Sequence, residues 1–364
     1  MAPRDRIRTT FVMEQHLGHG TFCQNLRRSL QDNSALDTSW VAVTYTNAGG
    51  WWEQIDMVPA HLRGTLTGRR QIRQGLRSHQ SDVAFFNTQV PAALAGKFVH
   101  DQPYILCTDI TPLQYNALRD HYRQQPDSNG LVEGYKHRVN LRLFQQAAHL
   151  IPWSTWVRQS LLVDYGVLPE RITVVPPGVD TEKWVPASNQ HVERPVRILF
   201  VGGDFQRKGG NTLLQAFRRL PAGFVELILV TRTAVANEPG IIIRNDLQAN
   251  SSELIALYQS CDIFVLPTHA EAFGIAAVEA SATGLPVIAT AVGGLTDVVV
   301  NEQTGLLVQP DDVDQLTDSL QRLLQQPTLR RQMGTAGRRH VEEQFDAEKN
   351  AAKIVQILGE VILH

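Results

Sequence analysis

The chain has 364 residues, of which 43% are hydrophobic and 19% charged, a globular composition and a length that favours two domains. Its formal net charge of −2 excludes the strongly basic surface that nucleic-acid binding requires. The cysteines, Cys23, Cys107 and Cys261, form no C-x-x-C pair, so neither a disulfide framework nor a thiolate zinc site is expected. The first apolar run is too short for a signal sequence or a membrane span, so we expect a cytoplasmic protein.

Short apolar, β-branched runs alternate with helical periodicity along the first half of the chain. This alternation predicts parallel strands joined by helices, as in an α/β domain. The expected strands are RTTFVME, WVAVTYT, DVAFFNT, YILCTDI, AAHLIPW and ITVVPPGVD, at residues 8–14, 40–46, 82–88, 104–110, 147–153 and 172–180.

The first of these strands leads into a glycine-containing turn, EQHLGHGTFCQNL. Ligands of open α/β sheets bind beyond the carboxyl ends of the strands. Gly18 and Gly20 therefore suit a close approach of the backbone to a phosphate. A purely structural turn is the alternative, because glycine is the usual residue wherever φ must be positive.

The segment between the second and third strands carries adjacent tryptophans, Trp51 and Trp52, and then a run of arginines. No acidic residue occurs from residue 57 to residue 81, and Leu66, Ile72 and Leu76 form a thin apolar stripe. We hypothesise that this surface meets an anionic membrane peripherally or an anionic acceptor; core packing of the tryptophans and a solvated helix face are the alternatives. The arginines are Arg63, Arg69, Arg70, Arg73 and Arg77.

A proline-rich polar stretch at residues 176–195 separates the two halves and is typical of a connector, with the domain boundary near residues 180–194. The second half again alternates strands and helices, and residues 346–364 have the apolar spacing of a terminal helix. The expected strands are RPVRILFVGG, VELILVT, GIIIRN, CDIFVLP, LPVIATA and TGLLVQP, at residues 194–203, 225–231, 240–245, 261–267, 285–291 and 304–310.

The strand that opens the second half ends in Gly202 and Gly203, and Arg207 and Lys208 follow at the mouth of a helix. Cations at a helix N-terminus oppose the macrodipole. An anion bound between the two cations and the helix amides would compensate this repulsion and so explain why the pair lies there. The alternative is that both are solvated basic residues at a loop edge.

Two glutamates frame the stretch EAFGIAAVE, Glu271 in a loop and Glu279 on the helix that follows. A fully helical segment would separate them by about 12 Å. Glycosidase acid and nucleophile pairs stand roughly 5 to 9.5 Å apart. The glutamates therefore suit the two ends of one long ligand, with a diphosphate bound at the helix start between them. The alternatives are that Glu271 is only a charge at the helix N-terminus and that Glu279 is a surface glutamate.

Residues 170–345 resemble the GT-B-fold retaining glycosyltransferases of family four, the glycosyl transferases group 1 type. The resemblance is carried by RITVVPPGVDTEKWVP, VGGDFQRKGG, and the long motif from CDIFVLPTHAEAFG to TGLLVQPDD. It implies an α/β fold with two Rossmann-like doubly wound domains facing a central cleft. Residues 1–180 would form the acceptor-side domain and residues 181–345 the nucleotide-sugar donor domain, with the helix at 346–364 packing back on the first domain.

The resemblance also implies roles for the residues already singled out. Glu271 would contact the donor sugar, Glu279 the ribose, and Arg207 and Lys208 the departing phosphate. Many relatives have a histidine after the fourth strand, where this chain has CTDITPLQYN, so Asp109 is expected as a sugar or acceptor contact, with a helix N-cap as the alternative. The expected donor-binding residues are Gly18, Gly20, Gly202, Gly203, Phe273, Gly274, Ile275 and Glu279.

The expected activity is transfer of a hexose, with retention, from a UDP- or GDP-linked sugar to an unidentified glycan, lipid or small molecule. No metal or other cofactor is expected, since two cations and a helix N-terminus can stabilise the leaving group. An epimerase or phosphorylase of similar fold, and a non-catalytic sugar-nucleotide-binding subunit, remain alternatives. The segment around Asn245 and Asp246 is expected near the base.

Overall fold

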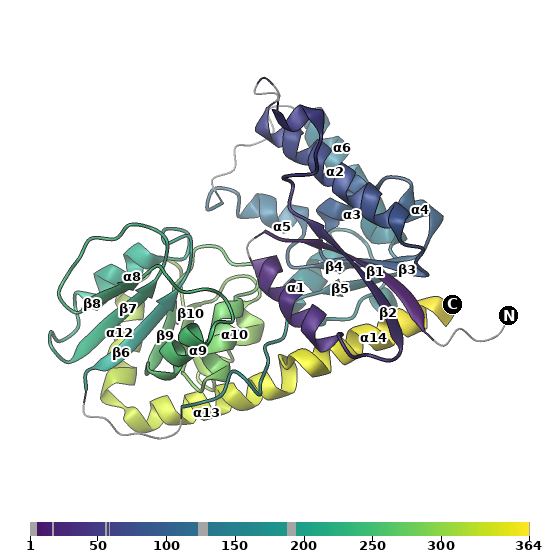
Figure 1. Ribbon diagram of the computed structural model, residues 1–364. Coiled ribbons are helices and arrows are strands. Elements are labelled where there is room, and N and C mark those ends of the chain that lie inside the picture. Colours follow the sequence, from purple (N-terminus) through teal and green to yellow (C-terminus); the bar gives the residue numbers. More distant parts are fainter. Residues whose placement is uncertain are drawn as a thin grey trace. The chain divides into compact units, whose positions relative to one another are not determined.

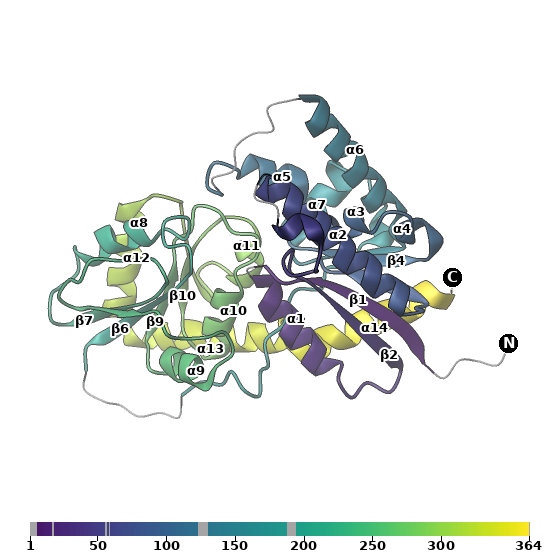
Figure 2. The same ribbon diagram turned by 45° about the horizontal axis from the view of Figure 1, so that its top comes forward.

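The computed structural model describes residues 6–16, 18–54, 57, 59–122, 130–187 and 194–363. These residues divide into two compact units (Figures 1 and 2). Unit 1 takes its described residues from Met1–Ala117, Gln125–Pro177 and Ala347–His364, and unit 2 from Leu118–Gln124 and Gly178–Asp346. Residues 118–122, expected in the first domain from their place in the sequence, thus group with unit 2.

Unit 1 is built on a parallel sheet whose described strands lie in the order β2-β1-β3-β4-β5. The strands are β1 (Ile7–Glu14), β2 (Leu36–Val43), β3 (Val83–Phe86), β4 (Tyr104–Thr108) and β5 (His149–Pro152). The helices are α1 (Gly18–Ser29), α2 (Ala60–Ser78), α3 (Gln89–Ala95), α4 (Phe98–Asp101), α5 (Pro112–Ala117), α6 (Gly130–Gln146), α7 (Thr155–Val163) and α14 (Ala347–Leu363), with 3-10 turns η1 (Trp51–Gln54) and η2 (Pro169–Arg171).

Helices cover both faces of this sheet (Figure 1), which explains why its central strands β3 and β4 are buried along their whole length. Val12 and Phe86 point to the face where α2, α3, α6 and α7 pack. The terminal helix α14 packs on α1, β1 and β3, and its Ile354 and Leu358 are buried. Unit 1 therefore takes part of its core from the last residues of the chain.

The strand expected at ITVVPPGVD is wrong. Residues 172–180 make only isolated bridges, one of which pairs Ile172 with Leu150. Two backbone bonds, from the amides of Thr173 and Val175, tie the segment to β5. The chain then reaches Pro176 and Pro177, which have no N–H to continue a ladder.

The prediction that Leu66, Ile72 and Leu76 form one apolar stripe on α2 is also wrong. Ile72 and Leu76 are buried in the core of unit 1, but Leu66 is 42% exposed, as is Leu62 at 47%. The buried face of α2 instead runs through Gly68, Ile72 and Leu76, which lie four residues apart. The two exposed leucines thus lie on the outer side of the helix.

Unit 2 has a second parallel sheet, with the described strands in the order β11-β10-β9-β6-β7-β8. All six strands expected in the second half are confirmed: β6 (Val196–Val201), β7 (Val225–Val230), β8 (Ile241–Arg244), β9 (Ile263–Leu266), β10 (Val287–Thr290) and β11 (Gly305–Val308). Helices lie on both sides of the sheet (Figure 2): α8 (Gly210–Phe217), α9 (Ser252–Gln259), α10 (Ile275–Ala282), α11 (Leu295–Val298), α12 (Val313–Gln325) and α13 (Pro327–Gln344).

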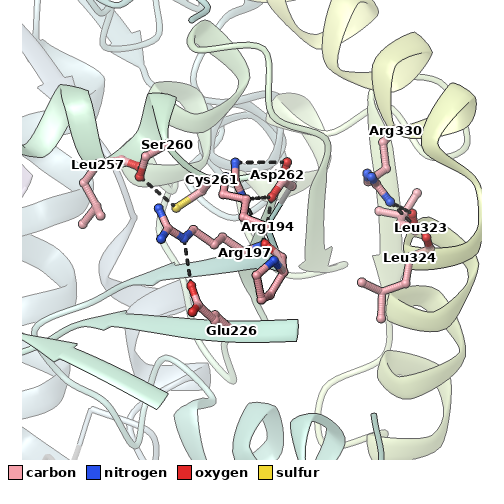
Figure 3. Close-up of polar contacts among 11 residues, drawn as sticks. Arg194, Arg197, Glu226, Leu257, Ser260, Cys261, Asp262, Leu323, Leu324 and Arg330 are labelled. Atoms are coloured by element: carbon pink, nitrogen blue, oxygen red, sulfur yellow. Dashed lines mark hydrogen bonds and ion pairs between the residues drawn. The ribbon is translucent and has the colours of Figure 1, made fainter. Parts of the chain in front are cut away.

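Ion pairs fix the amino ends of three strands in unit 2 (Figure 3). The Asp262 carboxylate, just before β9, accepts hydrogen bonds from the Arg194 side chain at 2.6 Å and from the backbone N–H of Arg197 in β6 at 2.8 Å. The Arg197 side chain in turn donates to Glu226 in β7 at 2.8 Å. These contacts hold the strands in register at the edge opposite their carboxyl ends, where ligands of such sheets bind.

Candidate functional site

At the carboxyl edge of the unit 2 sheet, β6 runs into a turn that contains both expected cations. Gly202 and Gly203 follow β6, and Arg207 and Lys208 lie in the turn before α8. The Arg207 carbonyl accepts hydrogen bonds from the backbone N–H of His269 at 2.9 Å and from the Thr268 hydroxyl at 3.0 Å. The turn after β6 is therefore tied to the loop after β9.

Lys208 and Glu271 form an ion pair across these two loops. Both side chains are largely buried, with exposed fractions of 16% and 10%. Burial lowers the pKa of Lys208, and the Glu271 charge partly restores it. From the sequence the two residues were expected to bind different parts of a ligand, and the structure brings them into direct contact.

The Arg207 side chain is held by three neighbours and is 9% exposed. Its Nη1 donates to the carbonyl oxygen of Ala270 at 2.8 Å, and its Nε lies 3.4 Å from the Asp204 carboxylate. The ring of Tyr122 lies against the guanidinium, with its centroid 4.9 Å from Cζ. Arg207 is thus fixed in orientation, and the alternative of a solvated basic residue is wrong.

The loop after β9 ends at the start of α10, as the sequence pattern predicts. Gly274 is the N-cap with φ of 99°, and no side chain caps the helix. A Cβ on Gly274 would lie 2.5 Å from Cδ2 of Leu295, so both the backbone conformation and the space favour glycine. The first N–H groups of α10, from Ile275 onward, therefore have no side-chain cap and offer an anion-binding terminus. Phe273 precedes the cap and is buried.

Glu279 lies on α10 and is 5% exposed, so the alternative of a surface glutamate is wrong. Its carboxylate accepts a hydrogen bond from the Tyr258 hydroxyl at 3.1 Å. Burial raises the pKa of Glu279 to about 7, an effect that the Tyr258 hydrogen bond partly opposes. A ligand hydroxyl at this carboxyl group would add the second partner that a buried acid favours.

Sequence reasoning missed the glycine pair that follows β10. A Cβ on Gly293 would overlap the carbonyl oxygen of Glu271, and the N–H of Gly294 donates to the carbonyl of Ala272 at 3.1 Å. The pair therefore lets the β10–α11 loop support the backbone that carries Glu271. The signal was present, since Gly-Gly directly follows an apolar strand.

Unit 1 has a separate polar cluster at the carboxyl edge of its own sheet. Asp109 follows β4, and its carboxylate lies 3.4 Å from Nε2 of His19 in the first turn of α1. Burial lowers the pKa of His19, but the charges of Asp109 and Glu14 more than offset this, so the pKa is raised. The alternative that Asp109 caps the following helix is wrong. The hydroxyl oxygen of Thr111, just before α5, accepts the hydrogen bond from the Gln114 N–H instead.

Gly18 and Gly20 flank this histidine within α1 rather than in a loop before it. His19 is 9% exposed, packs its ring 5.1 Å from that of Trp153, and leaves Nδ1 buried without a hydrogen-bond partner among the described residues. The glycines could be singled out from the sequence, but the histidine between them was missed. Its approach to Asp109 depends on the pairing of both β1 and β4 with β3, which no local sequence pattern indicates.

The remaining expected features are placed as follows. Asp246, after β8, pairs with Arg244 at 2.8 Å. Trp52 donates its indole N–H to Thr67 at 3.1 Å and lies under Arg70, 5.7 Å from Cζ to the ring centroid. All three cysteines are free thiols, outside any disulfide.

In the part of the chain that the structure describes, no helix is long and apolar enough to cross a membrane. In the same part, no cluster of three His, Cys, Asp or Glu residues could hold a metal ion.

Comparisons with known proteins agree with the fold. The profile of Glycosyltransferase Family 4 matches residues 52–183, and that of Glycosyl transferases group 1 matches residues 246–340. The chain is 35% identical over 244 residues to the MMP alpha-(1->4)-mannosyltransferase of Mycolicibacterium hassiacum, which covers 64% of this chain and 58% of that protein. It thus spans less than two thirds of the length of this relative.

Solved structures of the same architecture cover nearly the whole chain. Sucrose-phosphate synthase from Thermosynechococcus elongatus superposes with a TM-score of 0.78 at 19% identity, over 98% of this chain and 100% of that one. Anabaena Alr3699/HepE in complex with UDP-glucose has a TM-score of 0.67 at 17% identity, over 98% and 100%. The fold is therefore GT-B, and the chain belongs to the family-four glycosyltransferases of the group 1 type.

Proposed function

We propose that this protein transfers a hexose from a UDP- or GDP-linked sugar to an unidentified glycan, lipid or small-molecule acceptor, with retention of configuration and without a metal ion. The observation that carries the proposal is the uncapped N-terminus of α10 beside the Lys208–Glu271 pair. The relative named above is a mannosyltransferase, and the Anabaena protein was solved with UDP-glucose. The first supports transfer of a hexose, and the second supports a nucleotide-sugar donor.

Each residue of unit 2 then has a role that its surroundings suit. The N–H groups at the start of α10 bind the diphosphate, together with Arg207 and Lys208, whose charges stabilise the departing phosphate. Glu271 orients the sugar hydroxyls while it holds Lys208 in place. Glu279, in the first turns of α10, accepts from the ribose. Gly202 and Gly203 supply the backbone after β6, and a Cβ on Gly202 would lie 3.0 Å from Cγ of Lys208, so glycine there leaves Lys208 in its position.

In unit 1 we assign Asp109 to a sugar or acceptor hydroxyl, with His19 as its partner. Gly18 and Gly20 keep the first turn of α1 free of side chains on either side of His19. A carboxylate that already lies beside an imidazole ring is held in one orientation, which favours a specific hydroxyl contact.

A thermal-shift panel of UDP, GDP and ADP sugars tests the donor assignment. A ligand at 100 times its dissociation constant stabilises by about 2.7 kcal/mol, so the correct donor should raise the Tm clearly. Glu271→Ala and Lys208→Ala should abolish both the shift and turnover. Glu238→Ala is the control, since its partner Arg218 lies on the surface and away from the site. A shift that survives in both site variants would refute the assignment.

The reaction type needs a second assay. Release of the nucleoside diphosphate only in the presence of an acceptor distinguishes transfer from epimerisation and from plain binding. The anomeric proton of the product, observed by NMR, reports retention directly, and activity in excess EDTA tests independence from metal. An inverted product or complete inhibition by EDTA would overturn the corresponding part of the proposal.

We further propose that the outer side of α2 meets an anionic membrane. Leu62 and Leu66 are exposed there, as are Arg69 and Arg77, and the helix has no acidic residue. Apolar side chains flanked by arginines suit the interface of anionic lipids. Co-sedimentation with phosphatidylserine vesicles at low salt tests this: the wild type should bind, a Leu66→Glu, Arg69→Glu variant should not, and equal binding of both would contradict the proposal.

A further inference from the structure

Residues 118–122 group with unit 2, although the chain on both sides of the segment belongs to unit 1. They form a turn after α5, in which the N–H groups of His121 and Tyr122 donate to the carbonyl of Leu118. The two rings at the end of this turn contact the loops that carry the proposed phosphate-binding cations. None of these residues was singled out by the sequence.

The first contact is between Tyr122 and Arg207. The ring centroid lies 4.9 Å from Cζ of Arg207, within the range of a cation–π interaction. Asp204 and Ala270 engage the Nε and Nη1 atoms of the same guanidinium. Among the described residues, Nη2 has no hydrogen-bond partner, so the ring and the two oxygens fix the plane of the guanidinium and leave one end of its fork available to a ligand.

The second contact is between His121 and His269, whose rings are stacked with centroids 5.6 Å apart. His269 is joined to Arg207 by a backbone hydrogen bond of 2.9 Å, and its Nδ1 lies 3.1 Å from the Asp311 carboxylate. The segment therefore touches two adjacent points of one support, the paired loops after β6 and β9. One contact alone would leave the turn free to pivot.

We propose that Tyr122 is a positioning residue of the donor site, which holds Arg207 in the orientation that receives the diphosphate of the sugar nucleotide, and that His121 anchors Tyr122 there. The inference rests on the proposed function. An aromatic face also keeps water from the guanidinium, which strengthens its attraction to a phosphate oxygen. A segment from the acceptor-side half of the sequence thus completes the donor site.

Binding of UDP and GDP to the full-length protein, measured by calorimetry, tests the inference. Tyr122→Leu should raise the Kd of the preferred nucleotide by about 2- to 30-fold, the worth of one cation–π contact, whereas Tyr122→Phe should stay close to the wild type. The matched control is Tyr135→Leu, since Tyr135 is 67% exposed on α6. The donor KM should rise in parallel and the acceptor KM should not, a split that partial unfolding would not produce.

A second measurement does not depend on nucleotide. Phenylglyoxal modifies accessible arginines, and peptide mass mapping reports Arg207 separately. Its modification should be faster in Tyr122→Leu than in the wild type, and His121→Ala should give an intermediate rate. Equal rates in the wild type and Tyr122→Leu would overturn the inference, as would an unchanged or tighter nucleotide Kd. A wild type that binds no nucleotide at all would instead refute the proposed function, and the inference with it.

Discussion

Lys208 and Glu271 form a buried ion pair although 63 residues separate them in the sequence. Removing one partner of such a pair leaves the other charge buried without compensation, which costs more than removing both. The pair therefore links the integrity of unit 2 to the same two residues that we assign to the donor. Its energetics can be measured without any substrate.

We predict that Lys208→Met and Glu271→Gln each lower the free energy of unfolding by about 3 kcal/mol, because each strands a largely buried group. The double variant should lose less than the sum of the two. Urea denaturation of the four proteins gives the coupling energy as a double-mutant cycle. Glu238→Gln should cost less than about 1 kcal/mol, since Arg218 is 52% exposed. Strict additivity of the site variants would contradict a direct interaction.

The pKa of Glu279 predicts a dependence of stability on pH. Its folded value of about 7 lies above the ordinary value of 4.5, so the folded state binds the proton more tightly than the unfolded state. The contribution of Glu279 to the free energy of unfolding is fully present below pH 4.5. It falls by up to about 3 kcal/mol as the pH rises through 7. Glu279→Gln mimics the protonated acid and should raise the Tm at pH 8.5 but not at pH 4.5. An equal effect at both pH values would disprove the burial argument.

For His19 and Asp109 the expected dependence has a different origin. The pKa of His19 is raised, so the stability from the pair is present below the unfolded value of 6.5 and is lost as the pH rises through the folded value. Asp109→Asn should therefore lower the Tm more at pH 6 than at pH 9. Thermal unfolding across this range checks the trend, and a difference that stays constant with pH would argue that His19 remains neutral.

Gly274→Ala should lower stability for two reasons, the positive φ of 99° and the approach of the new Cβ to Leu295. Gly223→Ala isolates the first, because Gly223 has φ of 82° and no atom lies within 4 Å of the position that its Cβ would take. Backbone strain of this kind costs about 1–2 kcal/mol. The Tm loss should be larger for Gly274→Ala, which should also weaken nucleotide binding. Equal losses would mean that Leu295 moves aside freely.

The strands of unit 2 could be predicted because each is an apolar run bounded by turn residues. The residues of the proposed donor site lie at the ends of these runs, so Arg207, Glu271 and Gly274 could be singled out as well. Contacts between loops have no comparable pattern in the sequence. Neither the Lys208–Glu271 pair nor the closeness of His19 to Asp109 could be read from spacing, because both depend on which strands become neighbours.

Two errors have physical causes that the sequence did contain. The run ITVVPPGVD has the composition of a strand, but Pro176 and Pro177 prevent a continuous ladder. On α2, Leu66 was grouped with Ile72 and Leu76, whereas six residues separate Leu66 from Ile72 and place it away from the buried face. A strict helical period would have separated them.

The packing of α14 on α1, β1 and β3 has a practical consequence for engineering. A chimaera that exchanges donor specificity by replacing everything after residue 177 would also replace the helix at Ala347–Leu363, and with it Ile354 and Leu358 from the core of unit 1. The transplanted half must therefore end at residue 346, with the native tail restored behind it. The order of the polypeptide thus makes an insertion, rather than a fusion at one junction, the suitable unit of exchange for this chain.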